Sequence, residues 1–345
     1  MFRPAPGPLA GAYPAIFAEK HRPENHRPGS ARTAAKPAFA KRPLAGKRLY
    51  MERPAFTQNR GASLLYCTVV YLIAVPAAWY TFSASGLSPL WAMTAGLYVA
   101  SIITFLAMLP VNNGSVFDAY WSILPPAAAG YFATLAAVPD WSMRQIAVMT
   151  VVWFWAIRLT LNWARSFPGL HHEDFRYIDL YEKTPTPRWF VQLALVDLFP
   201  TLQIVLGCLP LYPALAMGDL SFGWLDGLAL GVGLAATLIE LVADEQMRAF
   251  VRQRTPGAHM ESGLWRYSRH PNYFGEMLFW LSLWLFALSA APAYWWTGIG
   301  VLAMFLMFVF ASIPMMDTRS RERRPGFADY EARTSSLMLW PPKGN

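Results

Sequence analysis

Long apolar runs separated by short polar segments make up the chain from about residue 61 onward. Each run is about 20 residues long, which is the length of α-helix that crosses a hydrocarbon layer of roughly 30 Å. The fold class that follows is all-α, a polytopic transmembrane helix bundle of about 7–8 spans. We place the spans near residues 64–83, 88–109, 121–138, 145–164, 189–216, 222–243, 272–289 and 294–316.

The fifth of these runs differs from the others because it is long and contains Pro200, Pro210 and Pro213. A proline inside a helix removes a backbone hydrogen bond and clashes with the preceding turn. We therefore expect this span to be kinked, or broken where neighbouring groups satisfy the released carbonyls.

Composition supports a membrane protein and divides the chain into two parts. Apolar residues make up 55% of the 345 residues and charged residues only 14%, well below the ~25% of a typical soluble domain. Residues 1–60 are rich in Pro, Ala and Arg, which is typical of a disordered segment. We predict a basic tail at 1–60 and a membrane domain at 61–345, and we expect removal of residues 2–55 to leave cofactor binding unchanged.

Lys and Arg are concentrated on one side of the predicted bundle. With eight spans, the tail shares its side with residues 165–188, 244–271 and 317–345, whereas the opposite loops carry only Arg144. Because basic residues favour the cytosolic side of a membrane, we predict that both termini are cytosolic. The basic tail lacks the interleaved aromatic residues of a nucleic-acid reader, so no nucleic-acid partner is predicted.

The segment in which the seventh span begins contains the densest set of polar residues that could bind a ligand or take part in a reaction. Pro271 suits the first turn of a helix, so free backbone N–H groups and the positive helix end are expected beside Arg269 and His270. Asn272 and Glu276 are four residues apart and share a face, where they could bind ribose hydroxyls or a carboxamide. These features predict a site for a phosphate or carboxylate group, with a helix cap flanked by snorkelling arginines as the structural alternative.

A second polar group lies at the cytosolic end of the sixth span. Glu240, Asp244 and Arg248 follow each other at intervals of four residues and therefore share one helix face. Ionisable residues near membrane depth favour a functional role. An internal ion-pair ladder that fixes this helix against its neighbours is the alternative interpretation.

A third group follows the eighth span. Arg319 belongs to an arginine-rich run, and Tyr330 and Arg333 lie a little further along. An aromatic ring and a guanidinium at this position could sandwich an adenine or bind a 2′-phosphate. The arginine run taken alone is also explained as a topology signal.

The fourth span carries Arg158 and Asn162, four residues apart and flanked by tryptophans. Because an unpaired arginine inside a membrane is too costly, we expect Asp197 of the fifth span to be its counter-ion. This set is equally compatible with a structural ion pair and with the polar floor of a substrate cavity.

One tempting metal motif is set aside. His171, His172, Glu173 and Asp174 are consecutive residues and lack the spacing of three or four that brings ligands together on a helix. No metal site is predicted.

Two of these segments resemble a known family. The motifs Gly263-Leu-Trp-Arg-Tyr-Ser-Arg-His-Pro-Asn-Tyr-Phe-Gly-Glu276 and Gly326-Phe-Ala-Asp-Tyr-Glu-Ala-Arg-Thr334 resemble the C-terminal half of the steroid 5-alpha-reductase family, above all its bacterial members of unassigned substrate. Residues 158–165 and 172–177 also look like family patterns, so the resemblance covers roughly 61–342.

The resemblance implies a membrane-embedded reductase that uses NADPH to reduce a carbon–carbon double bond conjugated to a carbonyl. A steroid-, isoprenoid- or lipid-like substrate would enter from the bilayer, in a bacterial inner membrane, with the cofactor site on the cytosolic face. Beyond this substrate and membrane lipids, no protein partner can be inferred. Arg158, Asn162 or a tyrosine would stabilise the developing enolate.

The resemblance also implies a cofactor-binding half at about 222–342. By position in the motifs and among the arginines near them, the expected cofactor residues are Asp244, Arg248, Arg269, His270, Asn272, Tyr273, Glu276, Arg319, Tyr330 and Arg333.

Two alternatives to the reductase remain open. The Arg-His-Pro-x-Tyr element also resembles the isoprenylcysteine carboxyl methyltransferases, which bind S-adenosylmethionine. An excess of arginine on the cytosolic side favours NADPH, which is the more anionic of the two cofactors. A transporter or scaffold without chemistry is the other alternative, although the sequence lacks the internal repeat that many transporters show.

Overall fold

The computed structural model describes residues 53–136, 141–217 and 220–344. Regular structure in these ranges is helical, apart from one isolated bridge between Ser268 and Ser335. Seven of the described helices are long and apolar enough to cross a membrane. The predicted all-α membrane bundle is therefore confirmed.

The N-terminal half contains these elements: η2 (Ala55–Gln58), α1 (Arg60–Ala84), α2 (Pro89–Val111), η3 (Gly114–Val116), α3 (Tyr120–Thr134), α4 (Met143–Ser166), α5 (Phe175–Lys183) and α6 (Arg188–Val191). The rest of the chain contains η4 (Gln192–Leu198), α7 (Phe199–Cys208), α8 (Leu211–Ala216), α9 (Trp224–Gln253), η5 (Gly263–Arg266), α10 (Pro271–Ala290), η6 (Pro292–Gly298), α11 (Ile299–Met307), η7 (Phe308–Ser312), α12 (Ile313–Arg323) and α13 (Phe327–Arg333).

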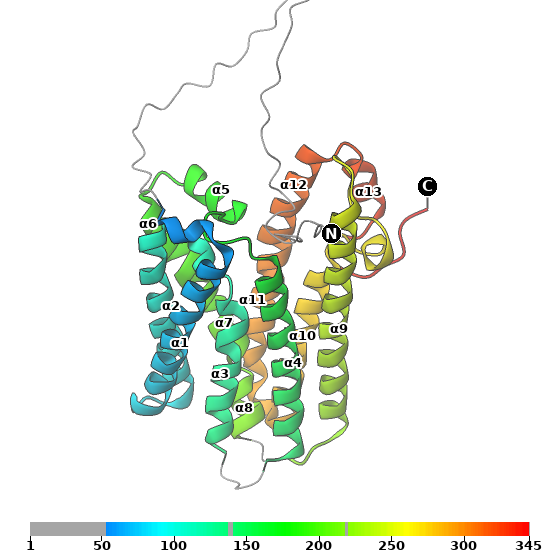
Figure 1. Ribbon diagram of the computed structural model, residues 1–345. Coiled ribbons are helices and arrows are strands. Elements are labelled where there is room, and N and C mark those ends of the chain that lie inside the picture. Colours follow the sequence, from blue (N-terminus) through cyan, green and yellow to red (C-terminus); the bar gives the residue numbers. More distant parts are fainter. Residues whose placement is uncertain (1–52, 137–140, 218–219, 345) are drawn as a thin grey trace, which may run out of the picture.

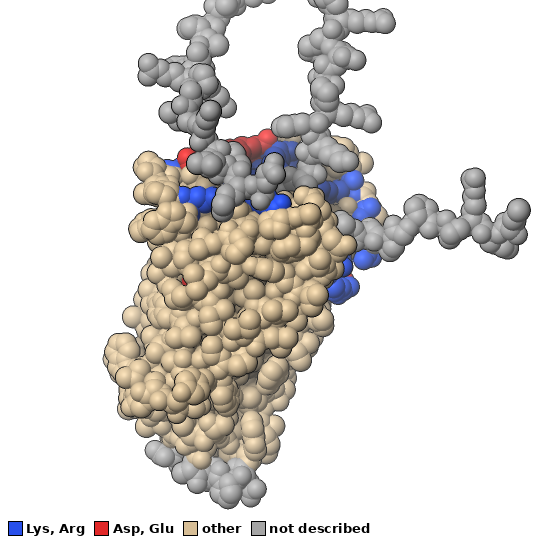
Figure 2. All heavy atoms as spheres, turned by 60° about the vertical axis from the view of Figure 1, so that its left-hand side comes forward, with Lys and Arg blue, Asp and Glu red and all other residues tan. Residues whose placement is uncertain are grey.

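Successive long helices run in alternating directions, so the start of α1 and the end of α12 lie at the same end of the bundle (Figure 1). Lys and Arg side chains gather at this end, which we call the basic end, and Figure 2 shows uncharged residues over most of the visible side of the bundle. The helix α3 has only 15 residues, and part of the predicted third span lies in 137–140, outside the described residues. The cytosolic orientation of the basic end stays a prediction that follows from its charge.

The proline-rich fifth span is broken, as predicted. It consists of α6, a π-helical turn (η4), α7 and α8 in succession. A second π-helical turn, η7, divides the last span into α11 and α12. Such turns often accompany functional sites in helices, and η7 precedes the stretch of α12 that reaches the basic end.

The helices α9 and α10 pack closely because Gly275 lies in their interface. A methyl group on Gly275 would come within 2.4 Å of the Glu240 Cγ and within 2.8 Å of the Ala236 backbone oxygen. Small residues allow membrane helices to approach each other this closely. The contact places the carboxyl-bearing face of α9 directly against the first turns of α10.

The fold begins earlier than the boundary that we predicted at residue 60. Arg53 donates hydrogen bonds to the carboxylate of Glu173 at 2.7 Å and to the backbone oxygen of His171 at 2.8 Å. Thr57 is fully buried, and the side chain of Asn59 caps α1. Residues 53–60 are therefore part of the membrane domain, because their polar groups bind loops that are distant in sequence. The predicted disorder of the tail concerns residues 1–52, which lie outside the described residues.

Candidate functional site

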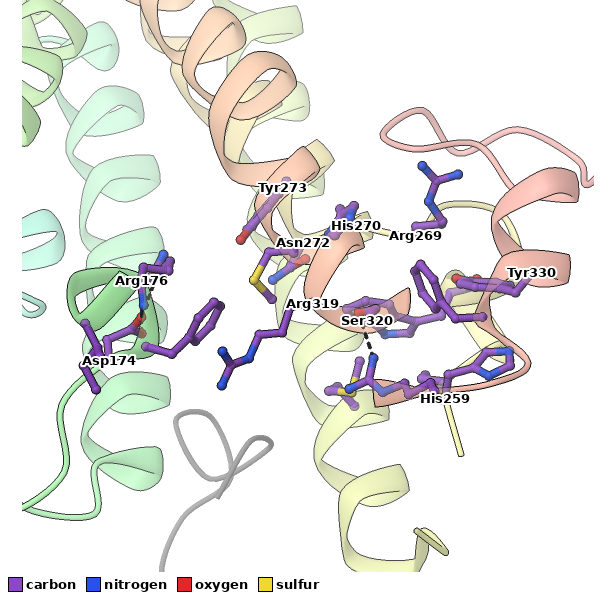
Figure 3. Close-up of a pocket in the computed structure, with 18 of the residues that line it drawn as sticks. Asp174, Arg176, His259, Arg269, His270, Asn272, Tyr273, Arg319, Ser320 and Tyr330 are labelled. Atoms are coloured by element: carbon purple, nitrogen blue, oxygen red, sulfur yellow. Dashed lines mark hydrogen bonds and ion pairs between the residues drawn. The ribbon is translucent and has the colours of Figure 1, made fainter. Parts of the chain in front are cut away.

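A cavity of about 300 Å³ lies at the basic end of the bundle. One wall is the segment 172–178, which includes the start of α5, and the other walls come from the ends of α9, α10 and α12 and from the start of α13 (Figure 3). Its volume is at the lower end of the range for small-molecule sites in proteins. The cavity thus brings residues from both halves of the sequence together at the basic end.

The predicted cofactor residues divide into two groups. One group lines the cavity and consists of Arg269, His270, Asn272, Tyr273, Arg319 and Tyr330. The other group lies outside its lining and consists of Asp244, Arg248, Glu276 and Arg333.

The first turn of α10 forms as predicted, with Pro271 as its first residue and His270 as its N-cap. The Nε2 atom of His270 lies 3.0 Å from the Asp317 Oδ1, and the ring of His270 stacks on that of Tyr273 with centroids 5.2 Å apart. Asp317 also accepts a hydrogen bond from the Arg269 Nη2 at 2.7 Å. Because a carboxylate that binds one imidazole nitrogen fixes the orientation of the ring, Asp317 positions His270 at the cavity wall.

The role of Asp317 was not predicted from the sequence, where the residue counted only among the acidic groups near the arginines. The available signal was an acidic residue at the end of an apolar span, directly before the arginine run. Its partners are on a different helix, so sequence spacing gave no indication of them.

Arg269 holds the C-terminal segment in place. Its Nη1 donates to the backbone oxygens of Glu331 at 2.9 Å and Thr334 at 2.8 Å. Its backbone N–H donates to the Ser335 oxygen at 2.8 Å. Because Arg269 also binds Asp317, most of its N–H groups stabilise the fold. The Asp317 carboxylate already compensates the positive charge of its guanidinium.

The structure gives no support to the adenine sandwich that we considered between Tyr330 and Arg333. The Tyr330 side chain is only 2% exposed, and its hydroxyl donates to the Trp265 backbone oxygen at 2.5 Å. Arg333 instead pairs with Glu261 at 2.5 Å on the surface. Both side chains are therefore already engaged by the protein, and the role of this pair in cofactor binding stays a prediction.

Arg158 forms a buried ion pair, but with partners other than the predicted one. It binds the carboxylates of Glu240 and Asp244, both on α9. Asp197, the counter-ion that we expected, instead accepts hydrogen bonds from Ser101 and Thr104 of α2. The reason is packing: α4 lies against α9, whereas the π-helical turn with Asp197 faces α2.

The neighbouring polar residues complete a network between α4, α9 and α10. Asn162 accepts a hydrogen bond from the Arg248 Nη2 at 2.5 Å. Glu276 accepts indole N–H bonds from Trp155 at 3.0 Å and Trp280 at 2.9 Å. The ion-pair ladder that we considered as the alternative interpretation is therefore present, and both predicted catalytic residues, Arg158 and Asn162, lie outside the cavity lining.

The segment 172–178 contributes the cavity residues that sequence reasoning left out. Asp174 caps α5 and accepts bonds from the Arg176 Nε at 2.9 Å and Nη2 at 3.0 Å. Burial alone would raise the pKa of Asp174, but the charge and hydrogen bonds of Arg176 outweigh it and lower that pKa. The signal was the family pattern at 172–177, which we weighed from its residues only as a metal motif. Among the described residues, no group of three or more His, Cys, Asp or Glu is arranged to hold a metal ion.

Asp118 lies next to this segment, and its surroundings predict that the stability of the folded protein depends on pH. It accepts a hydrogen bond from the Tyr177 hydroxyl at 2.7 Å, and burial, together with the charge of Asp174, raises its pKa from 3.8 to about 7. The folded protein then binds more protons than the unfolded chain between these two values, so stability falls as the pH rises through that window. We expect Asp118→Asn to reduce this fall and to be more stable than the wild type at pH 8.

Thermal unfolding in detergent at pH 5 and pH 8 measures this effect. The surface variant Asp179→Asn is the control, because Asp179 pairs only loosely with Lys183, at 3.7 Å. Equal stability changes at the two pH values in Asp118→Asn would contradict the assignment.

Comparisons with known proteins identify a family whose description assigns no activity. The family model described as "Protein of unknown function (DUF1295)" matches residues 104–334, a range that includes the whole cavity lining. An uncharacterized protein of Schizosaccharomyces pombe is 27% identical over 254 residues, which cover 66% of this chain and 73% of that protein. No solved structure matches. Because the family model covers well over half of the sequence, this chain belongs to the DUF1295 family.

Proposed function

We propose that this protein is an NADPH-dependent reductase that acts, within the membrane, on a carbon–carbon double bond conjugated to a carbonyl in a lipophilic substrate. The observation that carries the proposal is the cavity at the basic end, where arginines and aromatic rings converge on the first turn of α10. The resemblance of residues 263–276 and 326–334 to steroid 5-alpha-reductases supports the same activity.

The charge of the lining suits an anionic cofactor. The lining includes four arginines and two carboxylates, those of Glu173 and Asp174. Asp174 pairs with Arg176, and Asp317 pairs with Arg269, so the charges that suit an anion are those of Arg319 and Arg324. Glu173 is already bound by Arg53 at 2.7 Å and Arg188 at 2.5 Å. NADPH carries several negative charges, and each desolvated charge-assisted hydrogen bond contributes about 1.5–3 kcal/mol. S-adenosylmethionine is cationic on balance and fits such a lining less well.

The volume of the cavity indicates how much of the cofactor it would enclose. About 300 Å³ accommodates part of a dinucleotide, and the remainder would lie outside the cavity. NADPH supplies a hydride, and the protein must then hold the carbonyl oxygen of the substrate while negative charge develops on it.

Tyr273 is the donor that the cavity offers for this carbonyl oxygen. Arg158 and Asn162 are engaged with residues of α9 behind the cavity. Tyr273 lines the cavity and packs between His270 and Phe308 of η7. Figure 3 shows its hydroxyl directed away from α10 toward the side of Arg176. Its position at the membrane end of the cavity suits a substrate that arrives from the bilayer.

Binding of NADPH and S-adenosylmethionine to the detergent-purified protein tests the proposal. We expect saturable NADPH binding, and we expect Asn272→Ala to raise its Kd about five- to tenfold, the effect of one lost hydrogen bond. Arg266→Ala is the matched control, because Arg266 is an exposed arginine of the same segment and should leave the Kd unchanged.

Saturable binding of S-adenosylmethionine with none of NADPH would overturn the reductase. If NADPH binds the wild type and Asn272→Ala equally tightly, NADPH remains the cofactor. Its binding site then lies outside this cavity.

A further inference from the structure

The cavity wall contains a planar stack that joins the two halves of the protein. The guanidinium carbon of Arg319 lies 3.6 Å from the centroid of the Phe175 ring. Arg319 belongs to α12 and Phe175 begins α5, and both line the cavity. Figure 3 shows the Arg319 side chain pointing from α12 toward the side of Asp174 and Arg176. Aromatic rings and arginine guanidinium groups are the surfaces on which nucleobases stack in proteins.

The helix that carries Phe175 lies at the edge of the bundle, where Tyr177 and Tyr181 bind Asp118 and Glu173. None of the residues of α5 is buried, and Figure 1 shows the helix at the outer surface of the basic end. Elements with few buried contacts open at low free-energy cost. Phe175 itself is half-buried at the start of the helix. A rotation of its side chain away from Arg319 would open the space for one base and leave the bonds of Tyr177 and Tyr181 in place.

An excess of positive charge lies beside the stack. Arg324 directly follows the end of α12, five residues after Arg319, and donates to the Ser320 hydroxyl at 3.0 Å. Burial, together with the charges of Arg254, Arg323 and Arg319, lowers the pKa of Arg324 to about 10. A shift in this direction means that the surroundings disfavour the positive charge. An anion bound here would relieve that repulsion.

We infer that Phe175, Arg319 and Arg324 form the subsite for the adenosine phosphate end of the cofactor. The base inserts between the ring and the guanidinium, and a phosphate group binds at Arg324. The nicotinamide end then lies toward His270, Asn272 and Tyr273. This inference rests on the proposed function.

The test measures the Kd of NADPH and of adenosine 2′,5′-bisphosphate on the full-length protein. Phe175→Leu removes the ring and keeps an apolar side chain, and we expect it to raise both Kd values by the same factor, at least about fivefold. Phe175→Tyr keeps the ring and should bind like the wild type. Arg319→Lys keeps the charge without the planar surface and should weaken both ligands. Phe222→Leu, at an exposed phenylalanine outside the cavity lining, is the matched control and should have no effect.

The possible failures are distinguishable. Absence of NADPH binding to the wild type would overturn the proposed function itself. If NADPH binds, the subsite alone is overturned by any of three results: no binding of adenosine 2′,5′-bisphosphate, unchanged affinities in Phe175→Leu, or a loss confined to NADPH. Thermal unfolding of each variant checks that it is folded, which we expect because α5 contributes no buried side chain.

Discussion

Replacing Arg158 by methionine is expected to destabilise the folded protein by about 3–5 kcal/mol, the usual cost of breaking a buried ion pair. Arg158 is 7% exposed, and its partners Glu240 and Asp244 are 1% and 2% exposed. Without the guanidinium, two carboxylates remain close together in surroundings that water does not reach. Thermal and denaturant unfolding of the purified protein in detergent measure the loss.

Two further variants separate charge from position. Arg165→Met removes an arginine from the same helix whose side chain is 54% exposed and pairs with Glu245, so we expect a change below about 1 kcal/mol. Adding Glu240→Gln and Asp244→Asn to Arg158→Met should recover much of the stability, because the carboxylates no longer carry charge. If Arg158→Met were as stable as the wild type and lost only its affinity for NADPH, the structural role would be contradicted. Arg158 would then be a residue of the binding site.

Replacing Arg53 by alanine is expected to cost about 1.5–3 kcal/mol, the range for hydrogen bonds to a charged group, and to weaken NADPH binding. The guanidinium of Arg53 joins the Glu173 carboxylate to the backbone oxygens of Asn112, Leu170 and His171. Glu173 lines the cavity, so loosening this junction disturbs the wall formed by residues 172–178.

A chain that begins at Met51 is the matched control for Arg53→Ala. It lacks the basic segment but keeps Arg53, and we expect it to match the wild type in thermal stability and in NADPH affinity. Removal of residues 2–55, which we first expected to be harmless, should instead behave like Arg53→Ala. Loss of affinity in the chain that begins at Met51 would show that the basic segment itself contributes to the site.

The sequence alone determined the features that depend on neighbouring residues. Hydropathy over about 20 residues located the spans, because burial in a bilayer depends on the local average polarity. Pro271 marked the start of α10, and the prolines after Leu198 predicted the broken fifth span, because proline acts on the turn in which it lies. The one-sided distribution of arginine likewise indicated which loops share the basic end.

Only the tertiary structure decided which side chains meet. Arg158 binds two carboxylates of α9 and not Asp197. The rotation of each helix about its axis and the helices beside it decide which side chains meet, and hydropathy contains no information about these two properties. Tyr330 is buried because the C-terminal segment folds back onto Arg269. Phe175 reaches Arg319 across more than a hundred residues. Such contacts depend on how the helices pack against one another. Packing is determined by van der Waals contacts and hydrogen bonds between segments that are far apart in the sequence.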